Sequence, residues 1–368
     1  AIISCLFAMS TKEISFTLPL TIALFDICFL KGSVRQRLVR LSPFILCVLV
    51  MPFYLFGLDQ GIDAVTHGGG DETCIPLPRL TYLYTEFRVI ITYMRLLILP
   101  VAQNLDYDYP VYTSFFQTQV FASLALIIAL LGYGFYLLKT SQKNTCRFPA
   151  LLRISGFAIL WFFITLSIES GMVPLLDTIF EHRLYLPSVW FFISIAVVIA
   201  ELYQGSKTKK QFVATTTVIL IAISGYATYQ RNNVWRDHST LWADVVKKAP
   251  NNIRALTNLG TYYINRLDPA TAIPLLEQAV SIDPKYFPAH YALGLAFIQR
   301  GDPERALKHF VTTTELAPNG SKGWKEAGRL LLKRGDGDAD AVFFMRQALK
   351  IDPNAFSSQE KACMFGKF

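Results

Sequence analysis

Charged residues are scarce in this sequence. They make up 17% of its 368 residues, while apolar types make up 52%. A soluble domain usually carries about a quarter charged residues, so this composition argues against an ordinary soluble enzyme. The scarcity is uneven, because residues 1–230 hold 29 charged side chains and the shorter stretch 231–368 holds 33. We therefore predict a membrane domain over residues 1–230 and a domain of soluble type over residues 231–368.

Several familiar motifs are also absent from the sequence. Its six cysteines form no C-x-x-C pair, so neither a metal site nor a disulfide framework is expected. It contains no serine-hydrolase elbow, phosphate-binding P-loop or zincin motif. The net charge of +8 is spread along the chain, which gives nucleic-acid binding little support. Because the sequence opens at Ala1 inside an apolar run, we expect a fragment of a longer membrane protein.

Apolar runs in the first part are long enough to cross a bilayer, which takes about 20 mostly apolar residues. We predict six full spans, at residues 14–30, 42–58, 119–138, 154–170, 186–203 and 212–229. Loops rich in Lys and Arg follow the first, third and fifth of these spans. The positive-inside rule places all three loops in the cytoplasm. This alternation holds only if the segment 79–100 does not cross the membrane.

The segment 79–100 has the pattern of an amphipathic helix. One face of a helical wheel collects its polar side chains, namely Thr81, Tyr84, Thr85, Arg88, Thr92 and Arg95. We predict an interfacial helix inside a long external loop. Arg88 and Arg95 could clamp a lipid-linked phosphate, because Arg suits phosphate geometry, or they could simply contact lipid headgroups. Glu86 falls on the apolar side and therefore needs a polar partner or water.

The second part of the chain is repetitive. The pairs Pro250-Asn251, Pro284-Lys285, Pro318-Asn319 and Pro353-Asn354 recur at spacings of 34, 34 and 35 residues. A period of 34 is the tetratricopeptide signature. We predict a capping half-repeat and three full repeats, at residues 235–250, 253–284, 287–318 and 321–353. The expected fold is all-α, a polytopic transmembrane helix bundle followed by a tetratricopeptide-repeat α-solenoid.

The predicted repeats most often bind a protein or peptide in their groove, although a pure spacer is the alternative. The helix positions that a carboxylate clamp for chaperone tails would need hold Thr257, Thr261, Ala292 and Glu326, and only Lys322 fits. This composition excludes chaperone-tail binding. We favour a role in docking a partner or presenting an acceptor.

Charged residues in two short external segments are further candidates for a binding site. Lys12 in a hairpin could hold a phosphate, with Glu13 orienting it or a sugar, or both could belong to a solvated turn. Asp106 and Asp108 lie among aromatic residues, which suits a sugar site. The two carboxylates could also bind a divalent cation, or form only a turn before the next span.

The run Glu181-His182-Arg183 lies at the external mouth of a predicted span. Charged and titratable side chains this near the bilayer are costly unless they are paired or functional. We favour a function for this run over a purely structural pairing.

Several stretches together resemble one family. They are "STKEISFTLPLTIALFDICFL", "YLYTEFRVIITYMRLLILP" followed by "NLDYDYP", "FEHRLYLPS" and "NNVWRDHSTLW", and then the repeats. The chain resembles the transmembrane and tetratricopeptide-repeat O-mannosyltransferases and their bacterial relatives, which are glycosyltransferases of type C. The resemblance implies transfer of a sugar from a polyprenyl phosphate to an acceptor on the external face.

The resemblance also implies roles for individual residues. The family's catalytic acidic residue lies in a first external loop, which is expected upstream of residue 1, so no catalytic residue is assigned here. Lys12 and Glu13 match the family's "KE" turn. Arg183, with Glu181 and His182, would face the carrier phosphate or the sugar.

Two other functions remain open on the sequence alone. One is a non-enzymatic membrane scaffold that recruits protein partners, and the other is a polymerase or ligase of lipid-linked polysaccharide. The expected partners are a polyprenyl-phosphate sugar donor, a protein acceptor or partner at the repeats, and the lipid bilayer, with no nucleic acid. No cofactor is assigned beyond the divalent cation considered above. A bacterial inner membrane with periplasmic repeats is the first expectation, and the endoplasmic reticulum with lumenal repeats is the alternative.

Overall fold

The computed structural model describes residues 2–9, 13–56, 77–145, 147–171, 174–175, 177–334 and 338–357. Every regular element within these ranges is a helix, which confirms the predicted all-α class. The chain divides into two compact units. We call residues 1–103 and 109–228 the membrane unit, and residues 104–108 and 229–368 the repeat unit.

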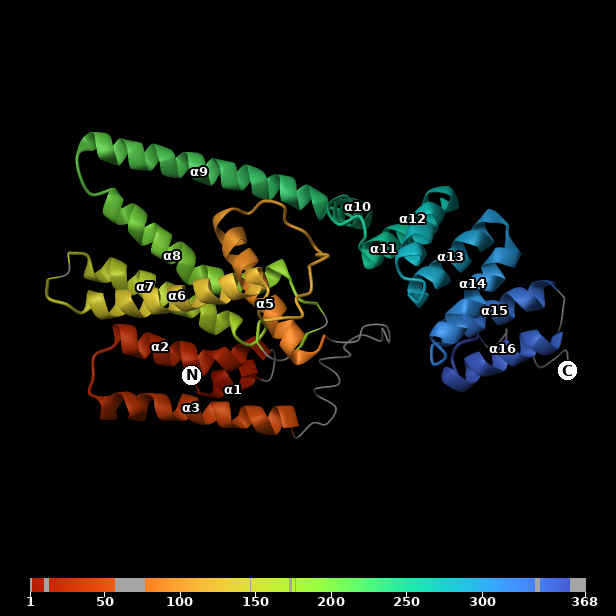
Figure 1. The fold of residues 1–368 in the computed structure, drawn as a ribbon, viewed down its shortest axis with the longest axis horizontal. Helices are drawn as coiled ribbons and strands as arrows, with labels where there is room; N and C mark the ends of the chain where they lie inside the picture. Colours follow the sequence, from red (N-terminus) through yellow and green to blue (C-terminus); the bar gives the residue numbers. More distant parts are fainter. Residues whose placement is uncertain are drawn as a thin grey trace. The chain divides into compact units, whose positions relative to one another are not determined.

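The regular elements in the described part of the membrane unit are helices joined by irregular connections (Figure 1). Their bounds are α1 Ile2–Met9, 3-10 helix η1 Glu13–Thr17, α2 Leu18–Phe29, α3 Val34–Phe56, α5 Arg79–Ile98, α6 Thr118–Ser141, α7 Pro149–Leu166, 3-10 helix η2 Glu181–Leu184, α8 Tyr185–Leu202 and α9 Lys207–Val234.

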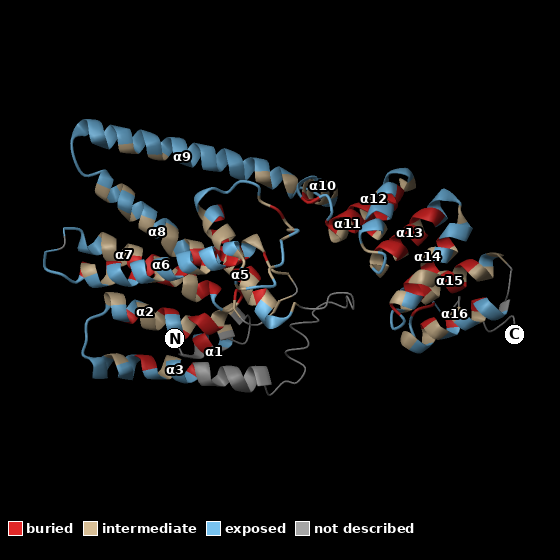
Figure 2. Ribbon diagram, in the orientation of Figure 1, coloured by how far each residue is buried: buried red, intermediate tan, exposed pale blue. Residues whose placement is uncertain are grey.

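Four stretches of the described chain are long and apolar enough to cross a membrane. They are Thr118–Ser141, Pro149–Leu166, Glu181–Leu202 and Lys207–Val234. They overlap the predicted spans at 119–138, 154–170, 186–203 and 212–229. Side chains along α8 and α9 are largely exposed (Figure 2), as expected for helices whose apolar surface lipid would cover.

The first two predicted spans look different from these four. Over residues 14–30 the chain forms η1 and then α2, a helix of 12 residues. Such a helix is about 18 Å long and does not reach across a hydrocarbon core of about 30 Å. Residues 42–56 of the predicted span 42–58 fall on α3, which has 23 residues, and residues 57–58 lie outside the described residues. The total of six spans therefore stays a prediction.

An ion pair joins α2 to α3. Asp26 is buried, and its Oδ1 accepts a hydrogen bond of 2.7 Å from Nε of Arg40. Arg40 Nη2 donates to the other carboxylate oxygen at 3.2 Å, so the pair is bidentate. This geometry suits a guanidinium and a carboxylate, and it holds the two helices together near their connection.

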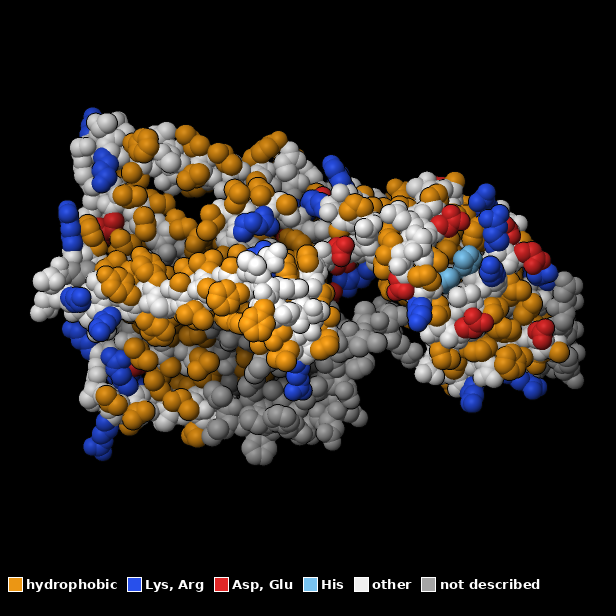
Figure 3. Space-filling view, in the orientation of Figure 1, with side chains coloured by type: hydrophobic (Ala, Val, Ile, Leu, Met, Phe, Trp, Pro, Cys, Tyr) orange, Lys and Arg blue, Asp and Glu red, His pale blue; other side chains and the backbone are white. Residues whose placement is uncertain are grey.

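The three basic connections lie at one end of the membrane unit. Figure 1 shows the α2–α3, α6–α7 and α8–α9 connections at the same, left-hand end, and Figure 3 shows Lys and Arg side chains there. The helix α5 and the beginning of α8 lie towards the other end. This arrangement is the one that the positive-inside rule predicts for loops sharing a compartment.

Helix α5 runs across the direction of α6 and α7 in Figure 1, as expected for a helix that does not cross the membrane with them. Part of its polar face is covered by protein. The side chain of Thr85 is buried, and its Oγ1 accepts a hydrogen bond of 3.0 Å from the backbone nitrogen of Tyr112. Thr92 shares a hydrogen bond of 2.8 Å with the hydroxyl of Tyr109. The segment that follows α5 therefore covers this face and forms hydrogen bonds with its threonine side chains.

The repeat unit is a series of helical hairpins. After α10 at His238–Lys248, the pairs are α11 Ile253–Asn265 with α12 Pro269–Ile282, α13 Phe287–Arg300 with α14 Pro303–Leu316, and α15 Ser321–Arg334 with α16 Asp338–Ile351. Each pair lies inside one predicted repeat. Side chains of Asp237, Asn252, Asp268 and Asp302 cap the helices that follow them, which satisfies amide groups that a helix leaves unpaired at its start.

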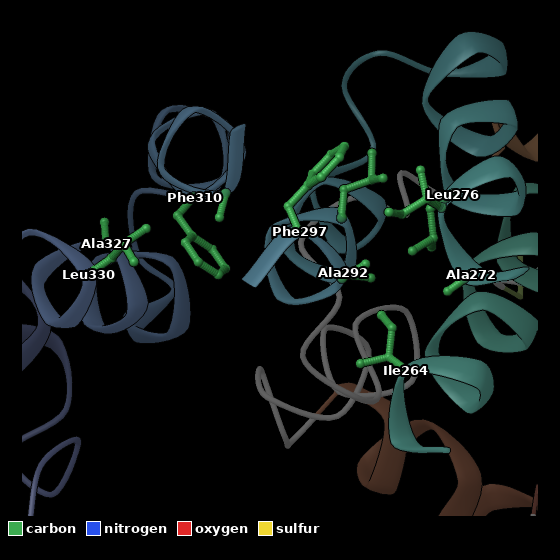
Figure 4. Packing of buried hydrophobic residues seen from close by; sticks show 12 residues of the cluster. Ile264, Ala272, Leu276, Ala292, Phe297, Phe310, Ala327 and Leu330 are labelled. Atoms are coloured by element: carbon green, nitrogen blue, oxygen red, sulfur yellow. The ribbon is translucent and has the colours of Figure 1, made fainter. Parts of the chain in front are cut away.

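Small residues face large ones inside these hairpins. Figure 4 shows Phe310 of α14 and Phe297 of α13 in a core that Leu276 and Leu330 extend. A Cβ atom added at Gly294 would lie 2.5 Å from a ring carbon of Phe310. In the same way, a Cβ atom added at Gly260 would lie 2.7 Å from Cγ of Leu276, and one added at Gly328 would lie 2.6 Å from Cγ of Met345. The 34-residue spacing of these glycines therefore reflects the close approach of two helices in each repeat.

We expect Gly294→Ala to destabilise the repeat unit by about 1–3 kcal/mol. The added methyl group overlaps Phe310, which is fully buried and has no room to move. Denaturant unfolding followed by circular dichroism and by protection of α13 and α14 from hydrogen exchange would measure the change. Gly320→Ala is the matched control, because its methyl group would meet its nearest neighbour at 3.4 Å. Equal stability of the two variants would contradict this account.

Candidate functional site

Two open cavities lie in the membrane unit. The first has a volume of about 410 Å³ and is lined almost wholly by apolar side chains of α5, α6, α7 and α8, among them Leu97, Leu130, Phe162 and Val198. The second has a volume of about 380 Å³ and lies around η2. Leu97 lines both cavities, so the apolar and the polar space adjoin at the last turn of α5.

The second cavity has a polar side. Glu181 and His182 of η2 line it together with Gln103, Tyr185 and Ser188, and apolar side chains complete its wall. Glu181 is half-buried and His182 is exposed. The His182 ring lies 5.1 Å from the ring of Phe180. Donors and acceptors for a polar ligand thus meet here beside an apolar groove, which is how small-molecule sites are commonly built.

Local sequence explains the shape of η2. Pro187 lies in the first turn of α8, where a missing amide hydrogen is tolerated. The chain enters α8 through the tighter 3-10 turn of Glu181–Leu184, a common form at helix starts. This turn brings Glu181 and His182 to the cavity just before the apolar helix begins.

Arg183 points elsewhere. Its side chain is 5% exposed, and its guanidinium donates to the backbone oxygens of Thr178 at 3.1 Å and Asp177 at 3.0 Å. The guanidinium also lies 5.4 Å from the centre of the Phe180 ring. Arg183 is not among the residues that line the second cavity. The three residues of the predicted run are therefore neighbours in the chain with different surroundings.

Glu86 of α5 lies close enough to Arg183 to interact with it electrostatically. Its side chain is fully buried, and neither carboxylate oxygen has a hydrogen-bond partner among the residues that the structure describes. Burial raises the pKa of Glu86 to about 8, although the charge of Arg183 acts in the opposite direction. The carboxyl group is therefore mostly protonated at pH 7.

Tyrosines of α5 meet the backbone on either side of Glu86. The Tyr82 hydroxyl donates to the backbone oxygen of Glu169 at 2.8 Å. The backbone nitrogen of Phe180 donates to the Tyr93 hydroxyl at 3.0 Å. α5 therefore holds both the turn after α7 and the segment that leads into η2.

The other predicted site residues that the structure describes do not come together at this cavity. Arg88 Nη1 donates to Ser123 Oγ of α6 at 3.3 Å, while Arg95 is exposed and donates to the backbone oxygen of Val101 at 3.0 Å. Asp106 is 7% exposed, and its Oδ2 lies 2.6 Å from Nε of Arg254 within the repeat unit. Asp108 is exposed.

Two predicted site residues lie at the edge of the described chain. Lys12 is outside the described residues, and Glu13 begins η1 without a described side chain. The described residues contain no group of three or more His, Cys, Asp or Glu side chains that could hold a metal ion. A divalent cation at Asp106 and Asp108 therefore has no such group to support it.

The sequence reasoning missed some of the lining residues. Tyr185 and Ser188 follow His182 at helical spacing in the same conspicuous run, so periodicity could have found them. Gln103 reaches the cavity from a distant segment with no motif of its own, and only the fold reveals it.

Comparison with known proteins agrees with this architecture. A profile of the tetratricopeptide-repeat family matches residues 268–330. Protein O-mannosyl-transferase Tmtc3 of Drosophila melanogaster is 25% identical over 297 residues, which cover 79% of this chain and 31% of that protein. Protein O-mannosyl-transferase F38B6.6 of Caenorhabditis elegans is 26% identical over 280 residues, covering 76% of this chain and 38% of that protein. The chain is similar to these protein O-mannosyl-transferases over about three quarters of its length.

This similarity confirms the family resemblance and, with the apolar helices, supports a membrane protein. Human TMTC3 is also similar, at 26% identity over 41% of this chain and 16% of that protein. The chain spans only about a third of the length of the fly and worm relatives. These relatives come from animals and give no support to a bacterial inner membrane.

Solved structures of MamA match part of the chain. One crystal structure has 25% identity and a TM-score of 0.29, covering 31% of this chain and 66% of MamA. MamA from Desulfovibrio magneticus has 23% identity and a TM-score of 0.30, covering 37% of this chain and 73% of that one. TM-scores this low add nothing to the assignment of the repeats.

We expect Glu86→Gln to remove a pH dependence of stability. The pKa of Glu86 is raised by folding to about 8, so the protonated form stabilises the folded state at low pH. That contribution is lost as the pH rises towards 8. The melting temperature of Glu86→Gln should therefore exceed that of the wild type by roughly 5 °C at pH 8 and by little at pH 5.

Thermal unfolding in detergent over this pH range measures the difference. Glu315→Gln is the control, because Glu315 is exposed on α14 and its replacement should leave the profile unchanged. Parallel pH profiles for the wild type and Glu86→Gln would contradict the assignment of a raised pKa.

Proposed function

We propose that this chain binds a polyprenyl-phosphate sugar donor and positions a protein acceptor within a membrane glycosyltransferase. One observation carries the proposal: the second cavity, at η2, adjoins the first cavity at Leu97. We call the second the polar cavity, because polar side chains form one side of it, and the first the apolar cavity. A lipid-linked sugar phosphate has the same two parts, a polar head and a long apolar tail. The name of the relatives, protein O-mannosyl-transferase, supports mannose as the sugar and protein as the acceptor.

The apolar cavity suits the tail of the carrier. Its wall consists of Leu, Ile, Phe and Val side chains from α5 to α8, with Tyr133 and Ser155 among them. Branched apolar side chains pack well against a branched isoprenoid chain, and the contact removes apolar surface from water. The tail would lie among helices that are themselves in contact with lipid.

The polar cavity suits the sugar phosphate. The imidazole of His182 can donate to a phosphate oxygen, and the amide of Gln103 supplies further donors. Glu181, as an acceptor, suits sugar hydroxyl groups rather than the phosphate. When the acceptor hydroxyl attacks the anomeric carbon, the bond to the phosphate oxygen breaks and negative charge grows on the leaving phosphate. Donors placed at this oxygen would stabilise that charge.

The repeats would hold the protein acceptor on the same external face. Stacked hairpins offer an extended surface on which a polypeptide can lie. A general base must take the proton of the attacking acceptor hydroxyl. Whether this face is lumenal or periplasmic stays a prediction. A scaffold that only recruits partners has no need for a cavity with a polar and an apolar part.

We expect His182→Ala to lower the rate of sugar transfer by about 100-fold, because a donor to the leaving phosphate is lost. The full-length protein is assayed with a synthetic polyprenyl-phosphate mannose and a protein acceptor, and mass spectrometry counts the transferred sugars. His182 is exposed, so its replacement should not disturb folding.

His238→Ala, on α10, serves as the control for the His182 variant. An unchanged rate in His182→Ala would count against the proposal, and so would transfer to glycans alone, which indicates a polymerase or ligase. Normal recruitment of partners without any transfer by the wild type would instead indicate a scaffold.

We expect Ser155→Phe to discriminate between donors by the length of their lipid. Ser155 lines the apolar cavity, so a phenyl ring there would displace the tail. The KM for a long-chain donor should rise about tenfold, since a few lost methylene contacts are worth about 1–2 kcal/mol. The KM for a short water-soluble donor should stay the same.

Gly132→Phe is the matched control for the Ser155 variant. A Cβ atom added at Gly132 would meet nothing within 4 Å, so a phenyl ring there starts from open space. A higher KM for both donors in Ser155→Phe would place the tail elsewhere.

A further inference from the structure

Residues 177–184, which we call the η2 loop, carry Glu181 and His182 to the polar cavity. Two kinds of hydrogen bond hold the loop on the side away from the cavity. Arg183 donates to the backbone oxygens of Asp177 and Thr178 at 3.0 and 3.1 Å. The backbone nitrogen of Phe180 donates to the Tyr93 hydroxyl of α5 at 3.0 Å. Both contacts act on the backbone of the loop.

The position of Arg183 follows from the 3-10 turn. Such a helix has three residues per turn, so successive side chains point about 120° apart. His182 is exposed and lines the cavity, while Arg183 is 5% exposed and does not line it. The guanidinium of Arg183 therefore lies under the loop and not in the cavity.

The hydrogen bonds of Arg183 close a ring within the loop. A guanidinium can donate to two carbonyl groups at once because its N–H groups form a rigid fork. Here the fork joins the beginning of the loop, at Asp177 and Thr178, to its end at Arg183. The Phe180 ring between them lies against the same guanidinium, 5.4 Å from ring centre to Cζ.

A buried guanidinium is costly unless it is hydrogen-bonded and paired. The guanidinium of Arg183 donates to the backbone oxygens of Asp177 and Thr178. Glu86 of α5 is fully buried and interacts with Arg183 electrostatically, but its carboxyl group is mostly protonated at neutral pH and balances little of the charge. The same helix supplies Tyr93, whose hydroxyl accepts the hydrogen bond from Phe180 and ties the loop to α5.

We propose that Arg183 is a positioning residue, whose guanidinium holds the η2 loop so that Glu181 and His182 face the polar cavity. It does this without touching the carrier phosphate. This inference rests on the proposed function in so far as its kinetic test measures sugar transfer. It differs from the role that the family resemblance implied for Arg183, which was direct contact with the phosphate or sugar.

A double-mutant cycle in the full-length protein tests the proposal. Arg183→Lys keeps the positive charge but cannot donate to both carbonyl oxygens in the same way. We expect it to lower kcat/KM for transfer from a polyprenyl-phosphate mannose by about 30-fold in the wild-type background. In the His182→Ala background the same change should cost less than about threefold, because residues that act through one another are not additive.

Independent effects of the two variants would overturn the proposal, because they indicate that Arg183 contacts the substrate itself. Near wild-type transfer by Arg183→Lys would also overturn it, since charge alone would then suffice. Tyr93→Phe is a second probe, which removes the acceptor for the Phe180 amide and leaves Arg183 intact. Its effect should likewise shrink in the His182→Ala background.

Hydrogen exchange provides a test that needs no transfer. In Arg183→Lys, amides of residues 177–184 should exchange at least tenfold faster than in the wild type, while those of α6 stay unchanged. Arg147→Lys is the control, because Arg147 is exposed in the α6–α7 connection. Unchanged exchange in the η2 loop would overturn the proposal. Faster exchange in a protein that transfers no sugar would instead reject the proposed function and leave the role of Arg183 standing.

Discussion

The membrane unit depends on one constraint, which is the cost of the polar groups that α5 takes out of water. The segment after α5 meets Thr85 and Thr92 through Tyr112 and Tyr109. On the other side, Tyr82 and Tyr93 bind backbone groups of Glu169 and Phe180. Because an unmet buried polar group costs about 1–3 kcal/mol, these contacts decide where three irregular segments lie. The polar cavity is a consequence of that arrangement.

This constraint also explains why charged residues in the same unit have different surroundings. Asp26 lies between helices with a bidentate partner in Arg40, so its charge is balanced directly. Glu86 has no such hydrogen-bond partner among the described residues and keeps its proton at neutral pH. Two buried carboxyl groups therefore reach low energy by two routes, ion pairing and protonation. Only the second route makes stability sensitive to pH near neutrality.

Much of the fold could be predicted from the sequence, because the helices of both units follow from repeated or apolar sequence patterns. The 34-residue period predicted the helical hairpins, and hydropathy predicted the four long apolar helices. The surroundings of α5 could not be predicted, since a helical wheel records which side chains are polar but not which loop will bind them. For the same reason the helical wheel does not reveal that Thr85 is buried.

The candidate site was only partly visible in the sequence. The run Glu181-His182-Arg183 drew attention by its charge next to an apolar helix, and two of its members line a cavity. Its third member looked the most suitable for phosphate but turns inward, because the carbonyl groups of Asp177 and Thr178 compete for it. Gln103 could not have been chosen, since its place depends on the path of the chain after α5.

The glycine in each repeat has a consequence for how such an array can change in size. Since Gly260, Gly294 and Gly328 each let one hairpin close on itself, most of the fit between two helices is completed inside a single 34-residue module. Adding or deleting a module then leaves its neighbours with their internal packing intact, because only one stacking face must be matched again. The reach of the array can therefore be adjusted by gene duplication, in steps of one hairpin, without redesigning any core.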